Sequence, residues 1–171
     1  MKNIATRLAL AALALPPFAA AQTPTAPPPT PVPAARGPAL EVAIEAARVA
    51  IATCTGLEQK VGVSVVDSAG VLKVLLAADG TSPRGVQSST NKAVTALVFK
   101  TATGELGERI KTDRELADKV AANTSYSSRA GGVLLKVNDE VIGAIGVGGA
   151  HGSEKDEACA VAGIQKIQGR L

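Results

Sequence analysis

The sequence is short of aromatic and sulfur-containing side chains. Its 171 residues include no tryptophan, one tyrosine, two phenylalanines, one histidine, one methionine and two cysteines. Beyond the N-terminal apolar segment, Phe99 and Tyr126 are the only aromatic residues, and lysine and arginine form no cluster. Because nucleic-acid binding uses basic stripes and base stacking on aromatic rings, we expect no nucleic-acid partner.

The first 21 residues have the pattern of a secretory signal peptide. Lys2 and Arg7 flank the start of an apolar run from Leu8 to Leu15, and three alanines at 19–21 form a small-residue cleavage site. The run is too short for a bilayer span, which takes about 20 apolar residues. We therefore expect a mature chain that begins at Gln22, has no integral membrane segment and is periplasmic or secreted. A retained signal anchor is the alternative.

Residues 22–38 contain seven of the ten prolines, which predicts a disordered, polyproline-like linker. The remaining residues, 39–171, are enough for one domain with its own core and too few for two. Loss of Lys2 and Arg7 with the signal lowers the 18 basic residues to 16 against 15 acidic ones, a net charge of +1. The mature protein is thus nearly neutral.

Apolar spacing and turn residues predict an α+β domain with the order α-β-β-α-α-β-β-α. Helices are expected over 39–55, from a cap at Ser88 or Ser89 to about Thr101, from a Thr112 capping box to about Ala121, and over 154–168. Residues 79–85 are expected to form a loop, and 105–110 at most a turn of helix. Two hairpins are expected from strands 61–66 and 71–78, and from strands 133–137 and 141–147. The hairpins favour an antiparallel sheet with helices packed on it. Strand 141–147 is almost wholly apolar, so we expect both of its faces to be covered, and a second subunit is one candidate cover.

Two cysteines in an exported chain allow a disulfide. Cys54 ends the first predicted helix and Cys159 lies in the last, so a bridge requires these helices to lie side by side. Two buried thiols that pack as small apolar residues are the alternative.

A candidate site lies where strand 141–147 meets the last helix. Glycines at 143, 146, 148 and 149 indicate close approach of other backbone, and the turn after them carries His151, the only histidine. Ser153 is the expected helix cap, with Glu154, Asp156 and Glu157 in the first turn. These carboxylates disfavour a phosphate site. The chain also lacks the partners for Ser-His-Asp or Cys-His hydrolysis.

The order of short motifs resembles the GlcG-like family of haem-binding or haem-degrading domains. The matching segments are Val66-Asp67 with Gly70, Asp79-Gly80, Lys92-Ala93 with Thr95-Ala96 and Thr101, Gly131-Gly132, and Gly143 to Ala150 followed by Asp156-Glu157. The resemblance covers residues 39–171. It implies a profilin-like fold of four to five antiparallel strands that assembles into homo-oligomers. Relatives include the C-terminal domain of some corrinoid adenosyltransferases. The chain departs from the family pattern at Gly148, where serine is common.

The resemblance implies haem, or another tetrapyrrole, as the small-molecule ligand. Haem iron takes His, Tyr, Cys or Met ligands, so the candidates are His151, Tyr126 and the two cysteines, with the turn at Gly148 and Gly149 at the ligand. Lys92 is either a solvated helix lysine or, by the family pattern, a cleft residue that pairs with an acidic ligand. A metal held by His151, Asp156 and Glu157 is a further hypothesis. Haem degradation is implied by the resemblance alone, so an accessory binding protein without catalysis is favoured. A module for small acidic metabolites and a purely structural oligomer are the alternatives.

Overall fold

The structure, a computed structural model, describes residues 34–171. The predicted signal peptide and most of the predicted linker lie outside these residues. Helices and strands follow in the order α1 (Leu40–Gly56), β1 (Gly62–Asp67), β2 (Leu72–Ala77), α2 (Pro83–Phe99), α3 (Thr103–Arg109), α4 (Arg114–Ala121), β3 (Gly132–Val137), β4 (Glu140–Gly148) and α5 (Ser153–Ile167), with a short 3-10 turn, η1 (Gln168–Arg170), at the end. The predicted α+β order is confirmed, with the short α3 added.

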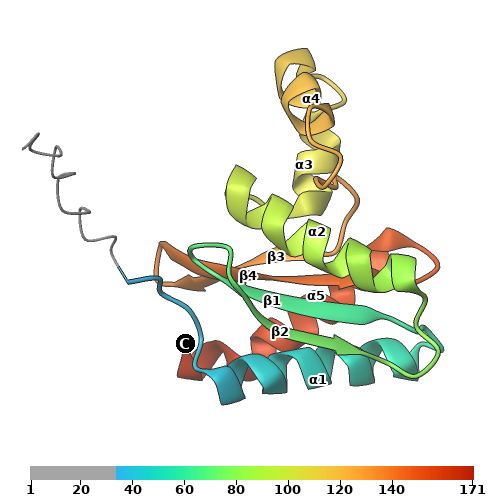
Figure 1. Cartoon of the computed structure of the whole chain (residues 1–171), viewed down its shortest axis with the longest axis vertical. Helices are drawn as coiled ribbons and strands as arrows, with labels where there is room; N and C mark the ends of the chain where they lie inside the picture. Colours follow the sequence, from blue (N-terminus) through green and yellow to red (C-terminus); the bar gives the residue numbers. More distant parts are fainter. Residues whose placement is uncertain (1–33) are drawn as a thin grey trace, which may run out of the picture. The chain divides into compact units, whose positions relative to one another are not determined.

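The four strands form one antiparallel sheet in the order β2-β1-β4-β3. Helices α1 and α5 lie together on one face and α2 crosses the other, while α3 and α4 project away from the sheet (Figure 1). Strand β4 is therefore central, and the chain's own helices cover both of its faces. This explains its nearly continuous apolar sequence without a second subunit.

Helix α2 begins earlier than the sequence predicts. The residues expected to form the end of a loop are helical from Pro83, and Ser82 is the N-cap, its hydroxyl accepting a hydrogen bond from the Gly85 N–H. The prediction of a cap at Ser88 or Ser89 is wrong because proline suits the first helical position and the serine before it supplies the cap.

Two other predicted helix caps are also wrong by one residue. Asp113, rather than Thr112, caps α4 and accepts from the Leu116 N–H. Gly152, rather than Ser153, is the N-cap of α5, and no side chain bonds there. In both cases the observed cap is the residue next to the predicted one. Local spacing in the sequence does not distinguish two adjacent cap candidates, so such predictions are uncertain by a residue.

The main core lies between the sheet and the α1–α5 pair. Valine and isoleucine side chains from β1 and β4 pack against a helix pair whose contact is made of small residues. In α1 these are Ala43, Ala46, Ala47 and Ala50, all fully buried. Cys54 and Cys159 form a disulfide with a Cα–Cα distance of 5.7 Å, so of the two alternatives the bridge is present, and the first and last helices lie side by side as it requires.

The opposite face of the sheet has a smaller apolar cluster and more buried polar groups. Ser64 of β1 hydrogen-bonds to the hydroxyls of Ser89 and Thr90 on α2, each at 2.8 Å. A Cβ on Gly146 would lie 2.0 Å from the Ser89 carbonyl oxygen, so α2 rests directly on the β4 backbone. The glycines of β4 thus serve close packing, as the sequence predicts.

The domain includes the last residues of the predicted linker. The Arg36 N–H donates to the Ser68 hydroxyl and the Ser68 N–H donates to the Arg36 carbonyl, each at 2.8 Å, which fixes this segment to the β1–β2 turn. Pro38 is buried. Among the described helices, none combines the length and apolar character of a membrane span.

Candidate functional site

His151 lies in the turn between β4 and α5. Gly149 and Gly152 flank it with φ of 124° and 104°, values that L side chains rarely adopt, so glycine is required at both places. The imidazole is exposed, but two backbone bonds fix the turn: the His151 N–H donates to Gln59 Oε1 at 2.7 Å and the Ala150 N–H donates to Asp156 Oδ1 at 3.0 Å. The histidine is therefore held at the surface by its main chain.

Gln59 reaches the turn from the end of α1. Its own N–H donates to the Cys54 carbonyl, and its Nε2 donates to the Leu57 carbonyl, each at 2.9 Å. The side chain is 9 % exposed. The disulfide-bonded end of α1 thus orients the group that holds His151, a contact that no motif in the sequence indicated.

Beneath the turn, Lys92 and Asp156 form a buried ion pair. Their Nζ and Oδ2 atoms are 2.6 Å apart, their side chains are 2 % and 4 % exposed, and Lys92 Nζ also donates to the Val147 carbonyl at 3.0 Å. A Cβ on Gly131 would lie 2.8 Å from Lys92 Nζ, so this glycine makes room for the pair. Burial lowers the pKa of Lys92 from 10.5, and the hydrogen bond and charge of Asp156 oppose that shift.

The ion pair corrects one interpretation of Lys92. The lysine is not solvated on a helix surface, and the carboxylate that it pairs with belongs to the chain itself. Because Asp156 bonds both Lys92 and the Ala150 N–H, the pair ties α2, the end of β4 and the start of α5 together. Lys92 acts on the histidine turn through Asp156.

A cavity of about 370 Å³ opens beside the turn. Its lining includes His151, Gly149, Lys92 and Asp156 among the predicted residues, and it adds Arg84 and Arg129, which sequence analysis did not single out. Both arginines are exposed; Arg84 lies in the segment that was expected to form a loop, and Arg129 lies between α4 and β3. Further lining residues are Ser82, Gly85, Ser88 and Ala150. The cavity thus combines one imidazole with two unburied guanidinium groups.

The other predicted site residues are not part of this lining. Tyr126 packs edge-on against Phe99, with ring centroids 5.3 Å apart, and Gly148 is buried at the end of β4. Glu157 Oε2 accepts from the Gly131 N–H at 3.3 Å. Within residues 34–171 no three His, Cys, Asp or Glu side chains are grouped to hold a metal ion. His151, Asp156 and Glu157 are therefore not gathered as a ligand set.

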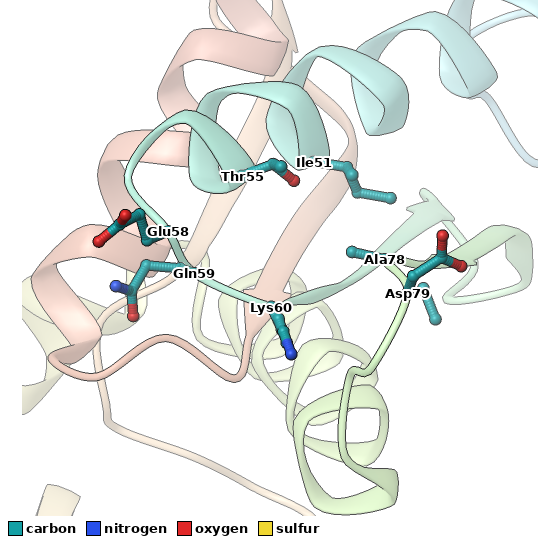
Figure 2. A pocket seen from close by; sticks show the side chains of 8 residues that line it. Ile51, Thr55, Glu58, Gln59, Lys60, Ala78 and Asp79 are labelled. Carbon is teal, nitrogen blue, oxygen red and sulfur yellow. The ribbon is translucent and has the colours of Figure 1, made fainter.

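A second cavity, of about 510 Å³, lies at the end of α1 and does not include His151 (Figure 2). Ile51 and Thr55 form its α1 side, and Lys60 stands between Glu58 and Asp79 in this view. Gln59 also lines it. The lining mixes both charge signs with apolar surface and so favours no single ligand class.

The sheet order and the helices on both of its faces define the profilin-like class of α+β domain. The chain belongs to the HbpS-like family of haem-degrading proteins, whose family model matches residues 39–165. This agrees with the GlcG-like resemblance seen in the sequence motifs.

Three solved structures illustrate the likeness. A double mutant of HbpS from Streptomyces reticuli is 30 % identical, with a TM-score of 0.73 over 86 % of this chain and 98 % of that one. The ORFY protein of Klebsiella pneumoniae is 26 % identical, with a TM-score of 0.70 over 76 % and 90 %. PduOC, crystallised as a haem complex, is 24 % identical, with a TM-score of 0.68 over 74 % and 92 %, and shows the shared fold. No match was found among curated protein sequences.

Proposed function

We propose that this protein is an exported accessory protein that binds haem, or a related tetrapyrrole, at the cavity beside His151. The observation that carries the proposal is the exposed imidazole of His151 on a turn whose backbone N–H groups donate to Gln59 and Asp156, beside a cavity that also contains Arg84 and Arg129. Membership of a family described as haem-degrading supports it.

The residues present fit the polar parts of haem. When bound, haem would supply an iron centre, and the imidazole of His151 is the side chain of this lining that would ligate it. Arg84 and Arg129 provide guanidinium groups for the two carboxylates of the macrocycle, because arginine binds carboxylates through paired N–H donors. Lys92 and Asp156 hold the histidine turn in place. Catalytic turnover is not part of the proposal.

A haemin titration of the mature protein tests this function. Wild type is expected to give a shifted Soret band, and His151→Ala is expected to lose or move that shift. This variant keeps the backbone bond to Gln59, so the fold and the turn are retained. Arg84→Gln and Arg129→Gln should each weaken binding by about tenfold or more, since a hydrogen bond to a charged group contributes roughly 1.5–3 kcal/mol and each 1.4 kcal/mol is tenfold in affinity.

The matched control is Arg48→Gln, which removes an exposed arginine of α1 outside the cavity lining. Its affinity should equal that of wild type. An unshifted Soret band in wild type would refute the proposal, and a His151→Ala spectrum identical to that of wild type would remove His151 as the ligand. Stabilisation by small organic acids, without haemin binding, would instead favour an acidic-metabolite module that uses the two arginines.

The export and assembly of the protein are further parts of the proposal. The signal pattern of residues 1–21 supports a periplasmic or secreted location, and a disulfide is compatible with an oxidising compartment. Mass spectrometry of the exported chain should find Gln22 at its N-terminus. Edge strand β2 and the turn before it expose Val71, Leu72 and Leu75, which supports a homo-oligomer. Light scattering on the purified protein would measure its mass.

A further inference from the structure

A separate cavity lies at the other end of α2. It has a volume of about 460 Å³ and is bounded by the end of α2, by α3 and by β3. It shares no lining residue with the His151 cavity. Lys100, Arg109 and Lys136 line it from these three elements, and Glu105 is its one carboxylate.

Lys100 adopts an unusual backbone conformation. It is the C-cap of α2 with φ 53° and ψ 33°, the left-handed region in which glycine or asparagine usually ends a helix. A lysine there is in a strained backbone conformation, and such outliers cluster at functional positions. Its charge also complements the negative C-terminal end of α2. The strained position places an ammonium group at the rim of the cavity.

Lys136 follows an irregularity in strand β3. The pairing with β4 shifts register between Leu135 and Lys136, and bulges of this kind re-aim the side chains beside them. Leu135 is fully buried, whereas Lys136 is exposed on the edge strand and lines the cavity. Successive side chains of a strand point to opposite faces of the sheet, so Leu135 packs in the core while Lys136 lies on the side of the cavity.

The three cations have no ion-pair partner among residues 34–171. Every ion pair of this part of the chain involves other lysines and arginines, including the nearby Lys111 with Glu108 and Lys119 with Glu115. With Glu105 counted, the cavity lining carries a net charge of +2. Positive charge gathered on a hollow surface raises the local concentration of anions.

Thr101 adds a hydroxyl group without a partner. It lines the same cavity and is 7 % exposed, and its Oγ1 is the one buried side-chain oxygen or nitrogen in the described residues that makes no hydrogen bond. A buried hydroxyl without a partner destabilises the fold, because it has lost its hydrogen bonds to water and gained none in the protein. A bound acceptor at the cavity, reached by rotation of the Thr101 side chain, would remove that penalty.

We propose that this cavity binds a small, multiply charged oxyanion of the phosphate or carboxylate kind, with Lys100, Arg109 and Lys136 as its cationic contacts and the Thr101 hydroxyl as a neutral donor. Arginine and lysine are the side chains that bind such groups through charge-assisted hydrogen bonds. The site is distinct from the haem site proposed above, so either one can fail without the other.

Calorimetric titration of the mature protein at low ionic strength tests the site, with pyrophosphate and citrate as separate probes for the two sources of oxyanion. We expect saturable binding of at least one probe. Arg109→Gln and Lys136→Gln should each weaken it by about tenfold. Lys111→Gln and Lys119→Gln remove the same charge from exposed, ion-paired lysines outside the cavity, so they should change affinity by no more than about twofold.

Thr101→Val keeps the side-chain shape and should weaken binding roughly threefold while the ligand-free protein stays folded by circular dichroism. Unchanged affinity in this variant would exclude Thr101 from the site. The whole proposal is overturned if neither probe saturates, or if the two control lysines matter as much as Arg109 and Lys136, because binding would then reflect diffuse surface charge. A tighter fit for pyrophosphate than for citrate, or the reverse, assigns the ligand class.

Discussion

The two faces of the sheet are packed by different kinds of side chain. On the α1–α5 face, branched apolar residues such as Val63, Val65 and Ile145 fill the space between sheet and helices, and the disulfide joins the two helices. On the α2 face, the apolar cluster is small and lies beside buried polar groups such as Ser64, Ser89 and Lys92.

This difference separates stability from ligand binding. Apolar burial gives the α1–α5 face most of its stabilisation and requires no particular partner for each group. On the α2 face each buried polar group needs a hydrogen-bond partner at the right distance and angle. These bonds therefore fix the position of α2 relative to the sheet more strictly than apolar contacts would. Both cavities with a clear charge preference lie along α2, at its two ends. The face with less apolar burial is therefore the one that presents ligand sites.

Removal of the disulfide should have the largest effect on stability. The bridge spans 105 residues, and on the chain-entropy model a loop of that size accounts for about 4–5 kcal/mol of the free energy of unfolding. Cys54→Ala combined with Cys159→Ala is expected to lower the urea midpoint accordingly. Amide exchange should rise in α1 and α5 more than in α2.

The control for this experiment is reductant. It should lower the midpoint of wild type and leave the double variant unchanged. Equal midpoints for oxidised and reduced wild type would show that the helix pair is held by its alanine contacts alone.

The second effect concerns the ion pair on the α2 face. Lys92→Met should lower the free energy of unfolding by about 3–5 kcal/mol, because Asp156 is left as an unpaired buried charge. Addition of Asp156→Asn should restore most of the loss, since the amide oxygen can still accept from the Ala150 N–H. Lys119→Met, which breaks an exposed pair with Glu115, should change stability by about 1 kcal/mol or less.

The pH dependence of unfolding tests the same pair. Because burial lowers the pKa of Lys92 below 10.5, the unfolded chain binds more protons than the folded one in the pH range just below that value. This lysine's contribution to the free energy of unfolding should therefore rise with pH there, and Lys92→Met should lack that rise. If the double variant Lys92→Met with Asp156→Asn is as unstable as Lys92→Met alone, the loss does not come from the unpaired charge of Asp156.

The sequence predicted the elements better than it predicted their connections. Periodicity placed all four strands and the α1 and α5 helices, because their apolar faces are set by local spacing. The start of α2 was missed because Val86 is the only large apolar side chain between Thr81 and Gln87, so no helical periodicity is visible there and only the Ser82–Pro83 cap marks it. His151 could be singled out as the only histidine.

The partners of His151 could not be found in the same way. Gln59 lies 92 positions away in the chain, and Lys92 lies 64 positions from Asp156, so these contacts exist only after α1, α2 and α5 pack on the sheet. The family pattern identified Lys92 as a candidate residue but did not indicate that its acid is internal. Arg84 and Arg129 carry no local signal at all.

The smallest effect is expected where α2 meets β4. Gly146→Ala would place a methyl group 2.0 Å from the Ser89 carbonyl oxygen and 2.6 Å from the Ala93 nitrogen, so the helix must shift. Overpacking of this kind typically lowers stability by about 1–3 kcal/mol. Urea unfolding would measure the loss, and haemin affinity should fall as well because the shift disturbs Gly85 and Ser88 at the His151 cavity.

Gly56→Ala is the matched control, since a Cβ at the end of α1 would meet nothing within 4 Å. It should leave the free energy of unfolding within about 0.5 kcal/mol of wild type. If Gly146→Ala also leaves the free energy of unfolding unchanged, α2 can move on the sheet without loss of stability. The claim that the α2 face is positioned more strictly than the α1–α5 face would then be wrong. A stability loss with unchanged haemin affinity would keep the contrast but place the ligand away from α2.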